Sequence, residues 1–238
     1  VAHGSTGAGN DQVRFDVALQ LVGYDLDVSA PIRELGLSRD ASTAYLEARG
    51  FSVPDDTTDY SINRGLWGTT IGGKETLTAK APLPADAYPD TTAPADAPDA
   101  PRTLTITFAD GLPVAVDDAS LSGVEVVETL NEIGGRHGVG RDVHVGDTIL
   151  GIKGRIGVEA PAAQILITTH RELEKVVLSE QQQVQKQKLG DVYGRLLHEG
   201  QYFDPVMRDV EAFLDHSQDV VAGTVTVKLF KGRATVQG

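Results

Sequence analysis

The sequence contains no cysteine, no long apolar run and no excess of basic side chains. Without cysteine the chain can form neither a disulfide framework nor a thiolate metal site, which suits a reducing interior. No stretch of about 18 apolar residues and no signal-peptide pattern occurs. We therefore expect a soluble, cytoplasmic protein that has no membrane partner.

Acidic residues outnumber basic ones by 34 to 21, which gives a formal net charge of -13 and a pI near 4.8. Binding of nucleic acid needs clustered lysine and arginine side chains that release counterions, so we expect no nucleic-acid partner. An acid excess keeps a protein soluble, and adaptation to a salt-rich cytoplasm is a side hypothesis.

Two kinds of catalytic centre lack their usual patterns. The six histidines show no HxxxH or HExxH pairing, so we expect no metal site. No GxSxG elbow is present, which argues against a serine hydrolase. We assign no catalytic side chain.

The order of helix and strand signals favours an α/β region followed by an α+β region. Residues 1–55 resemble the C-terminal part of a Rossmann-like nucleotide-binding domain, and residues 56–238 form the second region. Since the chain begins at Val1 and runs almost at once into glycines, we interpret its start as the end of a strand and the chain as part of a longer protein. The expected elements of the first region are helices over 12–22 and 39–48, the latter capped by Ser38, and strands over 25–30 and 51–54.

The second region mixes hairpins and helices in separate runs. Residues 81–101 are rich in Ala, Pro, Asp and Thr and are expected to form a surface loop. Asp110-Gly111 and Lys231-Gly232 each mark a hairpin turn. The other expected elements are a strand over 143–153 and helices over 123–133, 162–189, 191–198 and 206–214.

The stretch HGSTGAGND, residues 3–11, places three glycines directly before a helix start. Backbone amides in such a loop, together with the helix dipole, can bind phosphate. The spacing matches neither GxxxxGK[ST] nor GxGxxG, so an ordinary turn capped by Ser5 or Thr6 stays open as the alternative.

Polar side chains at the start of that helix suit a zwitterionic ligand. Asp11 can accept from an ammonium group, Asn10 can bind either pole, and the planar fork of Arg14 fits a carboxylate. The alternative is a solvated helix start at which Asp11 complements the helix dipole.

The same stretch, HGSTGAGNDQVRF, closely resembles the loop of argininosuccinate synthases. The resemblance covers nearly the whole chain in the family's order, through YSINRGLWGTTIGG (60–73), LNEIGGRHGVGRD (130–142), GIKGR (151–155) and VAGTVTVKLFKG (221–232). It implies arginine biosynthesis by ATP-dependent ligation of citrulline to aspartate through a citrullyl-adenylate, with release of AMP and pyrophosphate. It further implies Mg²⁺ with the nucleotide, a synthetase and multimerisation domain over 56–238, and a homotetramer.

The resemblance also implies ligand-binding residues by matching position. Those implied for ATP are Ala2, His3, Gly4, Ser5, Thr6, Gly7, Ala8, Gly9 and Asn10. Those implied for aspartate are Thr6, Asn10 and Asp11. Those implied for citrulline are Asn10, Arg14, Ser61 and Thr70, the last standing where the family often has serine.

Two departures from the family pattern stand out. Gly146 and Val158 occupy positions at which many members place a citrulline-binding Glu and Tyr, and the neighbouring acids Asp147 and Glu159 are candidates to compensate. The family's pyrophosphate-binding SGG-type loop and its C-terminal helix are not found in residues 1–238, so we expect this chain to be inactive alone. The competing hypothesis is a non-catalytic module that binds an amino acid or a nucleotide.

Overall fold

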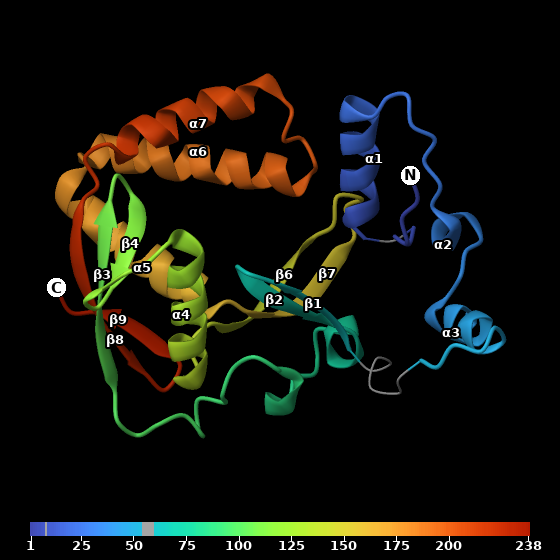
Figure 1. Ribbon diagram of the computed structural model, residues 1–238, viewed down its shortest axis with the longest axis horizontal. Helices are drawn as coiled ribbons and strands as arrows, with labels where there is room; N and C mark the ends of the chain where they lie inside the picture. The colour runs from blue at the N-terminus through green and yellow to red at the C-terminus, as the bar shows by residue number, and fades with distance from the viewer. Residues whose placement is uncertain (8, 54–59) are drawn as a thin grey trace. The chain divides into compact units, whose positions relative to one another are not determined.

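The computed structural model describes residues 1–7, 9–53 and 60–238. It divides into two compact units, and Figure 1 labels most of the helices and strands along the chain. Unit 1 comprises Val1–Asp59, Gly146–Gly154 and Lys188–Ala212, and unit 2 comprises the remaining three segments. The predicted domain boundary at 55/56 lies outside the described residues and stays a prediction.

The first segment of unit 1 is mainly helical. It contains α1 (Asp11–Val22), α2 (Pro31–Glu34) and α3 (Arg39–Glu47). The predicted helices over 12–22 and 39–48 are confirmed, and Ser38 caps α3 as expected, because its Oγ accepts a hydrogen bond of 3.1 Å from the Ala41 amide.

The two strands predicted in this segment are wrong within the described residues. Instead of a strand over 25–30, a single parallel bridge joins Ala2 and Ser29. Residues 51–53 form no strand, and Pro54 lies outside the described residues. A short apolar run forms a strand only when a neighbouring strand provides partners for its backbone hydrogen bonds. The described part of the chain provides no such strand at these positions.

Unit 2 contains a fully antiparallel sheet in the order β5-β4-β3-β8-β9, of which Figure 1 labels β3, β4, β8 and β9. Its strands are β3 (Arg102–Ala109), β4 (Leu112–Val116), β5 (Ala119–Ser120), β8 (Gly223–Phe230) and β9 (Arg233–Val236). Both predicted hairpin turns are confirmed, and each has two central residues of positive φ: Asp110 and Gly111 at 48° and 74°, Lys231 and Gly232 at 44° and 84°.

Two helices share the hydrophobic core of this sheet. They are α4 (Gly123–Arg136) and α5 (Pro161–Val177), whose apolar residues pack with Leu104, Ile106 and Val227 of the strands. The helix predicted over 123–133 is confirmed and extends by one turn. The alternation of threonine and apolar residues along β3 and β8 places one face of each strand in that core.

A second sheet has the order β1-β2-β7-β6. Its strands are β1 (Ser61–Gly65), β2 (Gly68–Gly72), β6 (Arg141–Asp147) and β7 (Lys153–Glu159). The single strand predicted over 143–153 is wrong, because the chain turns after Asp147: the Ile152 carbonyl accepts from the Thr148 amide at 2.8 Å, and Gly151 has a φ of 78°.

The remaining helices are α6 (Glu180–His198) and α7 (Pro205–Gln218). The helix predicted over 162–189 ends instead at Val177, since Leu178 is extended and the Ser179 hydroxyl accepts from the Gln182 amide at 3.2 Å. Gly190, the predicted break, lies inside α6. The predicted loop 81–101 is confirmed apart from one 3-10 turn, Ala85–Ala87. In the described ranges, no helix has the length and apolar character needed to cross a bilayer.

Candidate functional site

The glycine-rich loop of unit 1 lies between a bridged segment and the first helix. The His3 amide donates to the Ser29 carbonyl at 3.0 Å, and the Ser29 amide donates to the Val1 carbonyl at 2.9 Å. The loop ends at Asn10, the N-cap of α1, so its amides precede the positive end of a 12-residue helix. Ala8, one of the predicted ATP-binding residues, lies outside the described residues.

Glycine at positions 4 and 7 is not required by the protein's own packing. A Cβ built on Gly4 or Gly7 would meet no described atom within 4 Å, and neither residue has a φ in the left-handed region. A side chain would therefore fit in this structure. A ligand that closely approaches the backbone would explain the two glycines, as in phosphate-binding loops.

The other glycine-rich stretch, 134–140, behaves in the opposite way. A Cβ on Gly140 would lie 2.4 Å from the Pro161 nitrogen, and one on Gly134 would lie 2.8 Å from the Ile165 Cδ1. Gly140 also has a φ of 99°. These glycines are required by the close contact of α4 and its following turn with the start of α5, so this motif is a packing feature.

Three predicted site residues of unit 1 lie together on the first turn of α1. Asn10 Oδ1 accepts from the Ile149 amide at 2.8 Å, and Asp11 Oδ1 accepts from Arg14 Nη1 at 2.9 Å. Arg14 also donates from Nε to the His198 carbonyl at 2.9 Å. The Asp11 and Arg14 side chains are 72% and 36% exposed, so their ion pair adds little to stability and stays accessible to a ligand.

The two predicted residues of unit 2 lie on neighbouring strands of the second sheet. Thr70 of β2 is paired with Asn63 of β1, and Ser61 of β1 is paired with Gly72 of β2. Since directly paired and alternate residues share a face, Ser61, Asn63 and Thr70 lie on the same face. The opposite face carries Thr69 and Ile71, both buried.

The structure also places two of the residues that depart from the family pattern. Val158 of β7 is paired with Thr70, so it shares the face of the predicted hydroxyls. Glu159 lies on the other face, is 1% exposed, and accepts from the Asp90 amide and the Thr91 hydroxyl. The hypothesis that Glu159 compensates for the missing Tyr is therefore wrong, because its carboxylate holds the loop 81–101 from the buried side.

In unit 1, Asp147 forms an exposed ion pair of 2.8 Å with Lys153, and Gly146 precedes it in β6. Whether Asp147 compensates for the missing Glu stays a prediction. Across the described part of the chain, no group of three or more His, Asp or Glu side chains is arranged to hold a metal ion.

Comparison with protein-family models identifies both parts of the chain. The model for the arginosuccinate synthase N-terminal HUP domain matches residues 1–52, and the model for the arginosuccinate synthase C-terminal domain matches residues 60–238. The chain belongs to the argininosuccinate synthase family. The predicted fold class, part of a Rossmann-like α/β domain followed by an α+β synthetase domain, is thereby confirmed.

Curated argininosuccinate synthases align over the whole chain. The protein of Methanopyrus kandleri is 44% identical over 238 residues, covering 99% of this chain. Those of Methanocaldococcus jannaschii and Archaeoglobus fulgidus are 40% and 42% identical, over 100% and 99% of the chain. In each comparison the chain spans 60% of the relative's own length.

Sequence reasoning on the synthase loop missed two partner residues in unit 1. The Ile149 amide donates to Asn10 from 139 residues away in sequence. His198, 184 residues from Arg14, contacts it through its backbone carbonyl and through its ring Nδ1, which lies 3.0 Å from Arg14 Nη2. A backbone amide or carbonyl is present at nearly every residue, and the His198 ring lies far from the loop in sequence, so no spacing along the chain indicates these partners. The ligand-binding roles of the predicted residues stay predictions.

Proposed function

We propose that this protein is an ATP-dependent carbon–nitrogen ligase that joins citrulline to aspartate and forms argininosuccinate, AMP and pyrophosphate. Membership of the argininosuccinate synthase family supports the reaction. The observation that carries it is the open space at Gly4 and Gly7, where the loop tolerates a side chain and yet has none. A nucleotide phosphate close to those backbone atoms accounts for that choice.

The proposed reaction has two steps. The ureido oxygen of citrulline attacks the α-phosphorus of ATP, and pyrophosphate leaves. Mg²⁺ bound with the nucleotide would neutralise part of the phosphate charge. The aspartate amine then attacks the ureido carbon of the adenylate, and AMP leaves with the former ureido oxygen. Both steps depend on orienting the reactants and stabilising phosphoryl charge, which needs no side-chain nucleophile.

We assign the loop residues Ala2 to Asn10 to ATP, His3 through its backbone, and we assign Thr6, Asn10 and Asp11 to aspartate. Asp11 would accept hydrogen bonds from the aspartate ammonium group before the amine is deprotonated. Arg14 would bind the citrulline carboxylate through its fork. Since Arg14 and Asp11 are paired with each other, binding of the substrates exchanges that ion pair for contacts with the ligand poles.

On the exposed face of the second sheet, Ser61 and Thr70 are proposed to donate hydroxyl hydrogen bonds to citrulline. Val158 offers an apolar surface beside Thr70 where many members carry a tyrosine. This sheet face would therefore offer citrulline fewer polar groups than the same face does in members that carry the tyrosine. We further propose a cytoplasmic homotetramer that binds neither nucleic acid nor membrane.

The test is an assay of AMP release by the protein produced from its complete gene. AMP and pyrophosphate should form only when ATP, citrulline and aspartate are all present. Binding of ATP or an amino acid without AMP release would overturn the ligase and favour the non-catalytic module. Release of ADP would also contradict the proposal, because it places the cleavage at the wrong phosphoanhydride bond.

A further inference from the structure

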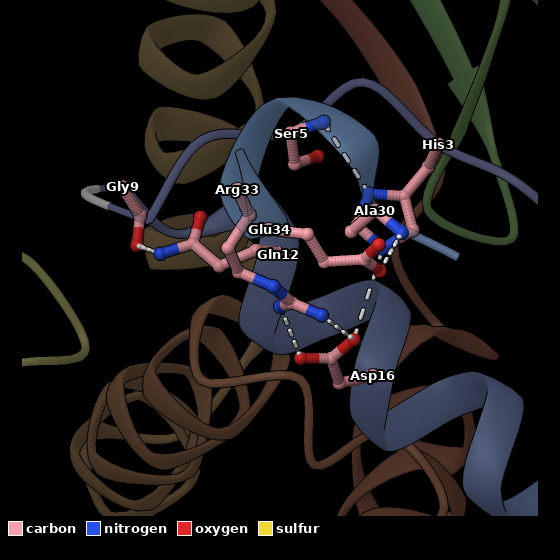
Figure 2. A network of polar contacts seen from close by, with 8 residues as sticks. All are labelled: His3, Ser5, Gly9, Gln12, Asp16, Ala30, Arg33 and Glu34. Atoms are coloured by element: carbon pink, nitrogen blue, oxygen red, sulfur yellow. Dashed lines mark hydrogen bonds and ion pairs between the residues drawn. The ribbon is translucent and has the colours of Figure 1, made fainter. Parts of the chain in front are cut away.

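The side chain of His3, at the start of the glycine-rich loop, is buried in a polar network (Figure 2). Only 10% of it is exposed. Its Nδ1 accepts a hydrogen bond of 3.3 Å from the Ser5 amide. Its Nε2 is buried, has no hydrogen-bond partner among the described residues, and lies 3.7 Å from Asp16 Oδ1.

These contacts determine where the proton of the neutral ring is held. Nδ1 accepts from a backbone N–H and therefore carries no proton, so the proton of the neutral imidazole is on Nε2. An N–H at Nε2 directed toward the Asp16 carboxylate is favoured electrostatically. The ring also contacts Phe15, with centroids 5.3 Å apart.

Asp16 is itself fixed by a neighbouring helix. Arg33 of α2 donates to both carboxylate oxygens of Asp16, at 2.7 and 3.4 Å. This guanidinium lowers the pKa of Asp16 below its ordinary value, chiefly through the hydrogen bond. A chain of contacts thus runs from Arg33 through Asp16 and His3 to the Ser5 amide.

The other end of the loop is held by a second buried side chain. Gln12, which is 5% exposed, donates from Nε2 to the Gly9 carbonyl at 2.5 Å (Figure 2). Gly4 and Gly7 lie between these two points, and a Cβ built on either would meet no atom of the described residues within 4 Å. The loop is therefore fixed near both ends, while its interior glycines are left open.

We propose that His3 is a positioning residue for nucleotide binding: its Nδ1 fixes the Ser5 amide, and Asp16, held by Arg33, keeps the ring in the Nε2-protonated tautomer. The role assigned to His3 rests on the proposed function, because it presupposes that ATP binds the loop. The ring acts on the loop backbone and does not itself touch the nucleotide. Loss of the Ser5 contact leaves the loop's donors less ordered before ATP binds.

The first test needs no enzymatic activity. In ¹⁵N NMR of the wild-type protein, the His3 ring should be protonated at Nε2 and unprotonated at Nδ1, and the Ser5 amide should exchange slowly with solvent. Asp16→Ala should mix the two tautomers and speed that exchange. A ring protonated at Nδ1 in the wild type, or Ser5 exchange unaffected by Asp16→Ala, would overturn the proposal.

The second test compares two substitutions of the same residue. Asn at position 3 can accept from the amide two residues on, as in an Asx-turn, whereas Ala cannot. His3→Ala should raise the KM for ATP by about tenfold, the worth of roughly one hydrogen bond, with kcat little changed. His3→Asn should bring the KM for ATP most of the way back to the wild-type value. The control His216→Ala, at an exposed histidine, should leave that KM unchanged.

The two tests separate the positioning role from the proposed function. If His3→Asn fails as badly as His3→Ala while both proteins fold, a side-chain acceptor at position 3 is not what matters, and the positioning role is wrong. If no variant, nor the wild type, releases AMP, the proposed function fails while the tautomer and the Ser5 exchange still decide the role of His3 in the loop.

Discussion

Arg14, on the first turn of α1, donates a 2.9 Å hydrogen bond from its Nε to the backbone carbonyl of His198, at the end of α6. The same guanidinium donates from Nη1 to Asp11 at 2.9 Å. One side chain thus joins a carboxylate proposed for aspartate to a distant helix end. The third nitrogen, Nη2, lies 3.0 Å from the His198 ring Nδ1. The guanidinium is therefore already oriented by protein contacts at all three nitrogens, so less of its rotamer freedom is lost when a substrate carboxylate binds.

Asp11→Ala should impair the second step of the reaction more than the first. Removing the acceptor for the aspartate ammonium group should slow argininosuccinate formation by roughly tenfold to a hundredfold, the usual worth of a charge-assisted hydrogen bond. Citrulline-dependent exchange of pyrophosphate into ATP, which reports adenylate formation, should be partly retained. Asp215→Ala, an exposed aspartate of α7, is the matched control, and equal loss of both steps would contradict the assigned role.

Gly4→Ala should weaken ATP binding without destabilising the protein. The added methyl group meets no described atom of the chain, so it should obstruct only a ligand. The KM for ATP should rise by about tenfold or more, while the temperature of thermal unfolding stays the same or rises slightly. Gly190→Ala, also unhindered but inside α6, should stabilise the helix and leave the KM unchanged. Unaltered ATP kinetics in Gly4→Ala would remove the main structural support for a phosphate at this loop.

Thr70→Val should raise the KM for citrulline with little effect on the KM for ATP. The substitution keeps the shape and the β propensity of the side chain but removes the hydroxyl, which should cost about fivefold to tenfold in affinity. Thr226→Val, on a half-buried strand face of the other sheet, controls for the general effect of this change. A variant whose citrulline KM equals that of the wild type would show that the Thr70 hydroxyl does not bind citrulline.

The ion pair of Asp16 and Arg33 should stabilise the folded protein at neutral pH and lose this effect at acidic pH. Because Arg33 lowers the pKa of Asp16 from 3.8 in the folded state, the ionised carboxylate stabilises the fold above that ordinary value. The contribution should disappear as the pH falls through the lowered folded pKa. In urea unfolding, wild type should exceed Asp16→Asn in stability at pH 7 and lose that advantage in acid. The exposed Asp209→Asn serves as control. If wild type remained more stable than Asp16→Asn at acidic pH, the ion pair would not be the source of the difference.

Much of the fold could be predicted because its signals are local. Ser38 caps α3 through an amide three residues away, and the Asp110-Gly111 and Lys231-Gly232 pairs have the positive φ angles that tight hairpins need. Such contacts depend on a few consecutive residues. The predicted unbroken helix over 162–189 is wrong, because Leu178 is extended and the Ser179 hydroxyl accepts from the Gln182 amide at the start of a new helix.

The surroundings of the candidate site could be predicted less completely, because they depend partly on contacts between residues distant in sequence. The motif identified Asn10, Asp11 and Arg14, whose proximity follows from one helical turn. Glu159 was misjudged, since only the pairing of β2 with β7 shows that its carboxylate lies on the buried face. The network of His3, Asp16 and Arg33 joins a loop and two helices, and no spacing along the chain indicates it.

The path of the ureido oxygen tests the central claim most directly. Citrulline labelled with ¹⁸O at the ureido group would be supplied with ATP and aspartate to the protein produced from its complete gene. The proposed citrullyl-adenylate requires the label to leave with the phosphate, so mass spectrometry should find ¹⁸O in AMP. Unlabelled AMP, or label recovered in inorganic phosphate alongside ADP, would contradict the proposed mechanism.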